Sequence, residues 1–277
     1  MAKIQVELGP VQETLLIPLL GRALETKKPS GLINDPKAVE IVDSLDYDFA
    51  KWERTSSMPG SAIRTRIYDR FVEAFLSEHP KSTVVEIGSG LNTRFERVDN
   101  GEVTWFDLDL PDTIALRRRF FEDAPRRTMI ASSVLDTDWM DAVHEGPGPW
   151  LFISEAVLIY LENDKARRAI TQIGERFERF RFLTDITSAK VISQQAKHDV
   201  MKHLSSDSWF RWACDDPNEI AGWVPGMRLM ESKTFVDTDR ELLQRAPFPW
   251  GFLSRWAPWL IRRMMKGYTL NRFDRGL

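Results

Sequence analysis

The strongest constraint on the fold is a change of pattern near residue 83. From there, short stretches rich in β-branched and aromatic residues alternate with helical stretches as far as residue 186. Strands that alternate with helices form a parallel sheet with right-handed crossovers. The sequence therefore predicts an α/β fold with a mostly parallel sheet of seven strands. The expected strands are 83–87, 103–107, 128–131, 150–154, 181–186, 228–235 and 267–273.

The chain before this region has a helical pattern. Apolar residues recur at helical spacing over 11–25 and over 61–78. An Asp-Pro pair at the start of 35–45 is typical of a helix N-terminus. We therefore predict an N-terminal helical cap over 1–80 and an α/β domain over 81–277.

Charge and cysteine content argue against several classes of protein. The 277 residues include 38 basic and 41 acidic side chains, and a net charge of −3 is unlike that of a general nucleic-acid binder. One cysteine and four scattered histidines offer no disulfide and no recognisable metal site. No apolar run reaches the ~20 residues of a membrane span, and the N-terminus lacks a secretion-signal pattern. We expect a cytoplasmic protein without stable membrane insertion.

A glycine turn follows the first expected strand of the α/β region. It reads Glu86-Ile87-Gly88-Ser89-Gly90. Glycines at the first strand-to-helix turn allow a ligand to approach the backbone closely. A nicotinamide dinucleotide site would have a third glycine, which is absent, so the E-x-G-x-G pattern favours S-adenosylmethionine, which carries no phosphate. An ordinary glycine turn is the alternative.

Acidic residues follow two further strands. Asp107 and Asp109 end the second strand, about 20 residues after the glycine turn, where an acid commonly binds ribose hydroxyls. The alternative is a cap for the helix that begins at Pro111. Glu155 follows the fourth strand directly, and ligands of open α/β sheets lie at the carboxyl ends of the strands. Glu155 is therefore expected to face a cofactor, and a solvated loop residue is the alternative.

These motifs together resemble one family. The upstream Ile63-Arg64-Thr65-Arg66, the turn over 85–94, the D-x-D-x-P pattern over 105–111 and the E-x-x-x-x-Y-L pattern over 154–161 occur in the order found in the leucine carboxyl methyltransferases. The resemblance is closest to their bacterial branch, the tetracenomycin-type O-methyltransferases of polyketide biosynthesis. It is good from about residue 10 to 190 and weak beyond.

The resemblance implies a Rossmann-like class I methyltransferase that uses S-adenosylmethionine. Arg64 would hold the cofactor's carboxylate bidentately, with Arg66 as the runner-up and Arg22, Lys27 and Lys28 as weaker candidates for a second cation. Asn92 stands where many members have Asp, so it is given no role in binding. The other implied contacts are Gly88 and Gly90 with the methionine moiety, Asp109 with the ribose, Ser133 and Val134 with the adenine, and Glu155 near the sulfonium.

The methyl acceptor is less well defined. A small metabolite with a carboxylate or a phenolic hydroxyl is expected, and only the phenol would need a general base. No catalytic residue is assigned. A carboxyl methyltransferase of a protein or peptide C-terminus and a non-catalytic cofactor-binding protein are the alternatives. The candidate bases are His198 and His203, which could equally lie on the exposed face of a helix over 188–204, and Tyr160 and Asp185.

The C-terminal segment combines aromatic residues with positive charge. Six basic residues and no acid occur between Leu242 and Phe273, among several Trp and Phe residues. An aromatic and basic insertion over about 238–266 is therefore expected between the last two strands. It could line the acceptor pocket and bind an anionic substrate through its arginines, rest on anionic lipid as an interfacial helix, or simply pack against the core. The first interpretation predicts an anionic, partly apolar acceptor.

Overall fold

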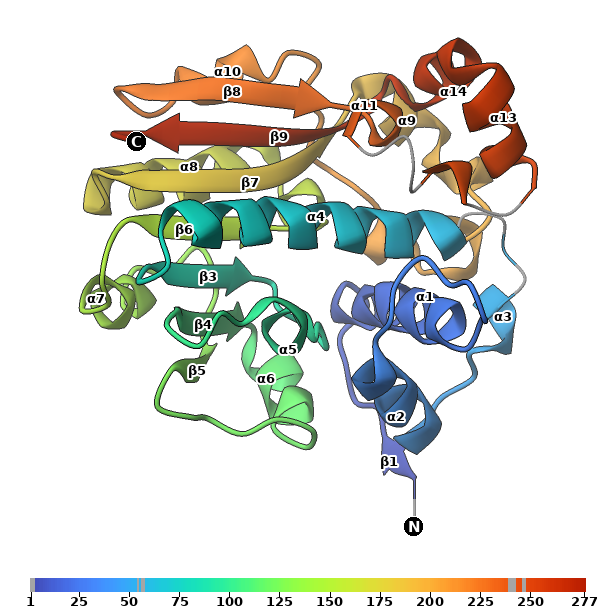
Figure 1. Cartoon of the computed structure of the whole chain (residues 1–277), viewed down its shortest axis with the longest axis horizontal. Coiled ribbons are helices and arrows are strands. Elements are labelled where there is room, and N and C mark those ends of the chain that lie inside the picture. Colours follow the sequence, from blue (N-terminus) through green and yellow to red (C-terminus); the bar gives the residue numbers. More distant parts are fainter. Residues whose placement is uncertain (1–2, 54, 56–57, 239–242, 246–247) are drawn as a thin grey trace.

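A seven-stranded sheet forms the centre of the computed structural model, which describes residues 3–53, 55, 58–238, 243–245 and 248–277 (Figure 1). The strand order is β5-β4-β3-β6-β7-β9-β8. Only β9 runs antiparallel to its neighbours, β7 and β8, so the predicted α/β fold is confirmed. The strands are β3 (Thr83–Ile87), β4 (Thr104–Asp109), β5 (Arg127–Ala131), β6 (Trp150–Ser154), β7 (Phe180–Thr187), β8 (Met227–Lys233) and β9 (Tyr268–Arg275).

Helices cover both faces of the sheet, so its central strands are buried along their whole length. Every residue of β3 and β7 is buried. One face packs against α7 (Trp139–His144), α8 (Asn163–Arg176) and α10 (Asn218–Ala221). The long helix α4 (Met58–Glu78) crosses the opposite face, where Ile67, Val72 and Phe75 join the core (Figure 1). The short helices α5 (Arg94–Val98) and α6 (Pro111–Arg117) follow β3 and β4.

The N-terminal helices form a separate apolar cluster beside the sheet. Asp35 caps α2 as the sequence predicts, because its carboxylate accepts a hydrogen bond from the Ala38 amide at 3.0 Å. Since α4 packs against the sheet itself, the division into domains at residue 80 stays a prediction. The elements are β1 (Ile4–Gln5), which pairs with β2 (Leu45–Asp46), and the helices η1 (Gln12–Leu15), α1 (Leu16–Thr26), α2 (Pro36–Ser44) and α3 (Ala50–Glu53).

The helix expected over 188–204 is wrong, because the chain there is broken into short turns. Helix α9 (Ala189–Gln194) ends where the Gln195 side chain bonds the backbone of Phe210, accepting from its amide at 2.8 Å and donating to its carbonyl at 3.1 Å. These two bonds tie Gln195 to a segment 15 residues further along the chain, so the helix does not continue beyond Gln194. Single turns follow as η3 (Gln195–Lys197), η4 (Met201–His203) and η5 (Ser206–Ser208).

The predicted insertion between the last two strands is helical. It contains α11 (Phe235–Thr238), α13 (Trp250–Trp256) and α14 (Pro258–Met265), while 239–242 and 246–247 lie outside the described residues. In Figure 1, α13 and α14 form one corner of the molecule, at the end of the sheet where β8 stops and β9 begins. Within the described part of the chain, no helix has the length and apolar character needed to cross a membrane.

Candidate active site

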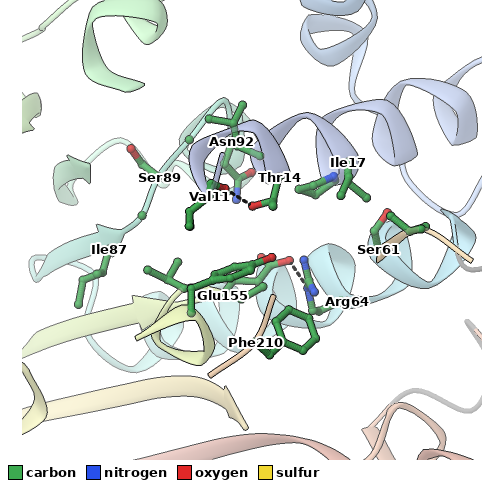
Figure 2. A pocket seen from close by; sticks show the side chains of 18 of the residues that line it. Val11, Thr14, Ile17, Ser61, Arg64, Ile87, Ser89, Asn92, Glu155 and Phe210 are labelled. Carbon is green, nitrogen blue, oxygen red and sulfur yellow. Dashed lines mark hydrogen bonds and ion pairs between the residues drawn. The ribbon is translucent and has the colours of Figure 1, made fainter. Parts of the chain in front are cut away.

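A cavity of about 670 Å³ lies at the carboxyl ends of the parallel strands. This is the position where open α/β sheets bind their ligands, and the volume is within the range of about 300–1,000 Å³ typical of small-molecule sites. Its walls come from the turns after β3, β4, β5 and β6, and from the N-terminal and C-terminal helices. Figure 2 shows Val11, Thr14 and Ile17 on one side of the cavity, with Arg64, Glu155 and Phe210 across from them.

The glycine turn forms one wall, and two of its residues require glycine. Gly88 and Gly90 have φ angles of +66° and +49°, which L-residues with a side chain rarely adopt. A Cβ atom on Gly88 would also lie 2.3 Å from a methyl group of Val157. The turn is therefore held close to the loop after β6, and both predicted glycines line the cavity.

The two acids of β4 lie in different environments. Asp109 lines the cavity and accepts hydrogen bonds from the amides of Gly90 and Leu110, both at 2.7 Å. Burial raises its pKa to about 6, against the lowering effect of these amides. Asp107 is fully buried between Arg117, at 3.0 Å, and Arg127, at 2.7 Å. Asp109 is thus the acid available to a ligand.

The side chain of Glu155 is only 8% exposed and is paired with two arginines, so the solvated-loop alternative is wrong. Arg64 donates to it from Nε at 2.8 Å, the contact drawn in Figure 2, and Thr65 donates from its hydroxyl at 3.2 Å. Arg94 pairs with its second oxygen. Burial would raise the pKa of Glu155, but the charges of Arg94 and Arg64 lower it to about 2.

Arg94 is the central residue that the sequence reasoning missed. Its fully buried guanidinium contacts Asp69, at 3.0 Å, and also Glu86 and Glu155. The available signal was its position inside the turn motif, four residues after Gly90. A buried arginine with three carboxylate partners fixes the ends of β3 and β6 relative to α4.

Glu86 and Asn92 are hydrogen-bonded to each other at the wall of the cavity. Burial raises the pKa of Glu86 to about 7, against the effect of Arg94. Asn92 donates to Glu86 Oε1 at 2.7 Å, while Thr93 occupies the N-cap of α5. Asn92 therefore orients a carboxyl group of the cavity wall instead of capping a helix.

The remaining candidates for the cofactor site divide into two groups. Ser133 and Val134 line the cavity after β5, and Arg22 lines it while bonded to Asp35 and to the Leu91 carbonyl, both at 2.8 Å. The others do not line it, because Lys27 and Lys28 lie in the turn after α1 and Arg66 is held by a partner on its own helix, α4. Lys27 pairs with Asp43, Lys28 with Glu25 and Arg66 with Glu73.

Only some of the candidate bases lie at the cavity. Tyr160 and His198 line the cavity, whereas His203 does not. Asp185 stands behind Tyr268, a cavity residue that the sequence analysis did not single out. The Tyr268 hydroxyl donates to Asp185 and accepts from Arg64 Nη1 at 3.2 Å. Burial raises the pKa of Asp185 to about 6, partly offset by Arg64.

The insertion contributes apolar side chains to the cavity. Trp250, Ile261 and Met265 lie on its wall. None of the insertion's arginines within the described residues lines it, and Arg262 instead pairs with Asp237. The expectation that these arginines bind the acceptor is therefore wrong, because α14 turns its basic face outward. No metal-binding group of three or more His, Cys, Asp or Glu occurs among the residues that the structure describes.

The fold and the site together define a Rossmann-like methyltransferase. Solved structures of low sequence identity share the fold over nearly the whole chain. A protein of Thermobifida fusca, provisionally described as a methyltransferase, has a TM-score of 0.61 and 15% identity, with 94% of this chain and 95% of that one covered. The plantazolicin methyltransferase BamL has a TM-score of 0.54 and 10% identity, with 96% and 98% covered.

Sequence comparison gives the family. A family model of leucine carboxyl methyltransferase matches residues 16–174. The tetracenomycin polyketide synthesis O-methyltransferase TcmP of Streptomyces glaucescens is 29% identical over 84% of this chain and 86% of its own. The S-adenosyl-L-methionine-dependent methyltransferase dpfgK of Gibberella zeae is 27% identical over 93% of each. The chain belongs to the leucine carboxyl methyltransferase family, and the predicted enzyme class and cofactor are confirmed.

Replacement of Arg94 tests whether its ion pairs hold this site together. Arg94→Ala leaves three carboxylates without their shared cation, so the free energy of unfolding should fall by about 3–5 kcal/mol in urea denaturation. Arg94→Lys should recover only part of the lost stability, because lysine lacks the planar guanidinium that contacts several carboxylates at once. Arg126→Ala, which removes an exposed partner of Asp99, is the matched control and should change stability little. Equal losses in Arg94→Ala and Arg126→Ala would contradict this role.

Proposed function

We propose that the protein transfers a methyl group from S-adenosylmethionine to a hydroxyl oxygen of a small, largely apolar metabolite. The observation that carries the proposal is that one cavity joins two kinds of wall. Turns with glycines and carboxylates lie at the strand ends, and an apolar chamber with the Tyr268–Asp185 pair lies beside them. A methyl donor and its acceptor must share such a space.

The cavity wall fits the cofactor in charge and in polar groups. Glu86 and Glu155 suit the ammonium and sulfonium of S-adenosylmethionine, and an acidic wall of this kind would repel the diphosphate of NAD. Two buried polar atoms on the same wall, Glu86 Oε2 and Ser89 Oγ, have no hydrogen-bond partner in the structure, which is typical of ligand-binding groups.

We assign the cofactor contacts to residues of this wall. Arg64 would bind the carboxylate, since Glu155 and Tyr268 occupy only two of its five N–H donors. Asp109 would bind the ribose and Glu155 would lie near the sulfonium. Gly88 and Gly90 would border the methionine moiety, and Ser133 and Val134 the adenine. The bound cofactor supplies an activated methyl group with a good leaving group, so the protein mainly orients the reactants and excludes water.

The second part of the cavity favours an apolar acceptor. Its lining comes from segments that are distant in sequence, and an apolar wall with few polar groups is typical of a small-molecule site. These lining residues include Ile63, Val191, Met201, Phe210, Phe235, Leu243, Trp250, Ile261 and Met265.

The Tyr268–Asp185 pair favours a phenolic hydroxyl over a carboxylate. The Tyr268 oxygen has a second lone pair that can accept a hydrogen bond from an acceptor hydroxyl. As that hydroxyl loses its proton to Tyr268, the tyrosine's own proton passes to Asp185, which becomes neutral. A carboxylate acceptor, in a metabolite or at a peptide C-terminus, is already ionised and has no use for such a path.

Arg64 tests the cofactor contacts. Arg64→Ala should weaken S-adenosylmethionine binding roughly tenfold to a hundredfold, because a charge-assisted hydrogen bond contributes about 1.5–3 kcal/mol. Arg64→Lys should recover part of the affinity for S-adenosylmethionine. Isothermal titration measures both, and Arg66→Ala, which removes the surface partner of Glu73, is the control. A loss in Arg66→Ala alone would transfer the role to Arg66, and tight binding of NAD would overturn the cofactor assignment.

The acids of β4 give a second test. Asp109→Ala should weaken cofactor binding, and Asp109→Asn should do less harm, because an amide oxygen still accepts from a hydroxyl. Asp107→Asn should mainly lower stability, because it weakens two buried ion pairs with Arg117 and Arg127. Titration calorimetry combined with urea denaturation separates the two effects. If Asp107→Asn alone abolished binding in a folded protein, the assignment of Asp109 would be wrong.

Tyr268 tests the nature of the acceptor. With a panel of apolar phenols and the matching carboxylic acids, methyl transfer should occur to the phenols. Tyr268→Phe should lower kcat roughly 10²–10⁴-fold, the usual contribution of general-base catalysis, and leave cofactor affinity unchanged. Because Asp185 must be ionised to take the proton, kcat of the wild type should rise with pH through about 6. Methylation of the acids alone, unaffected by Tyr268→Phe, would show a carboxyl methyltransferase instead.

A further inference from the structure

Four aromatic side chains of the C-terminal insertion are exposed, and two of them, Phe248 and Phe252, contact each other. Phe248, Phe252, Trp256 and Trp259, here called the aromatic ridge, are 83%, 57%, 69% and 66% exposed. Only two other large hydrophobic side chains in the described part of the chain, Met230 and Leu277, are exposed. Large apolar side chains gathered on one exposed surface mark a site of interaction.

The ridge is surrounded by positive charge. Arg255 on α13, Arg262 and Arg263 on α14, and Lys266 directly after α14 are all exposed. The segment from Leu242 to Phe273 contributes six positive charges and no negative one. Since the whole chain has a net charge of −3, the rest of the molecule carries −9. The charge of this segment therefore favours a negatively charged partner.

The opposite side of the same helices packs against the interior of the protein. Trp250, Ile261 and Met265 line the cavity, so the ridge is not a displaced part of the core. Helices α13 and α14 also form a corner of the molecule (Figure 1). A corner with tryptophans beside arginines and lysine has the composition of an interfacial membrane anchor, in which indole rings lie at headgroup depth and cations contact anionic lipid.

We propose that α13 and α14 dock the protein reversibly on the surface of an anionic lipid bilayer. The four ridge residues enter the interface, and Arg255, Arg263 and Lys266 contact the headgroups. A second copy of the chain fits this surface less well, because two ridges brought together would place their positive charges against each other. Docking does not depend on the proposed methyl transfer, and it directs the wall of the apolar chamber toward the lipid.

The test is cosedimentation of the full chain with vesicles. Binding should be strong to phosphatidylcholine vesicles that contain phosphatidylglycerol and weak to pure phosphatidylcholine. Arg263→Gln with Lys266→Gln should weaken binding about 25-fold, since each cation near an anionic surface contributes about fivefold. The matched control is Lys81→Gln with Lys165→Gln, two exposed lysines distant in sequence from the ridge, which should bind like wild type.

A second variant tests the aromatic side chains of the ridge. Trp256→Ala with Trp259→Ala should also lose vesicle binding while its circular dichroism stays unchanged, because both side chains are exposed. Absence of binding by the wild type, or an equal loss in the Lys81 and Lys165 control, would overturn the proposal. Analytical ultracentrifugation tests whether a second copy of the chain binds the ridge instead. A wild-type dimer that the ridge variant turns into a monomer, with vesicle binding unchanged, would assign the ridge to a second copy and also overturn it.

Discussion

The buried charge of Arg94 is the interaction on which the candidate site depends. Burial of several carboxylates at the ends of β3 and β6 is costly unless a cation offsets their desolvation. Arg94 supplies that cation to Asp69, Glu86 and Glu155 at once. Its contacts set how α4 lies on the sheet and how far the loop after β6 stands from the glycine turn. These ion pairs stabilise the shape of the cavity, because separating any one of them would leave a buried charge without its partner.

The same electrostatic principle extends across the molecule as a chain of alternating charges. Three of its four acids lie between two arginines, so the loss of one arginine changes the electrostatic environment of two acids. Such a network connects the N-terminal helices with the last strand. In order, its members are Arg22, Asp35, Arg97, Asp69, Arg94, Glu155, Arg64, Tyr268 and Asp185.

Local patterns predicted the parts of the site that local structure determines. Asp109 ends a strand, the glycine turn and Glu155 each follow a strand directly, and the carboxyl ends of parallel strands meet at one edge. Tyr268 could not be predicted in this way, because its place beside Thr187 depends on strand pairing across about 80 residues of sequence. The broken segment after α9 is another such case, since the contact between Gln195 and Phe210 is tertiary.

The antiparallel direction of β9 has a further consequence for how this enzyme can diversify. Because β8 runs with the other strands and β9 runs against them, the connection between the two strands begins and ends at the edge of the sheet that holds the cavity. Its length and composition can change without moving any strand that ends at the glycine turn. Exchange of this one continuous segment can therefore reshape the part of the cavity wall that Trp250, Ile261 and Met265 form, while the glycine turn stays in place.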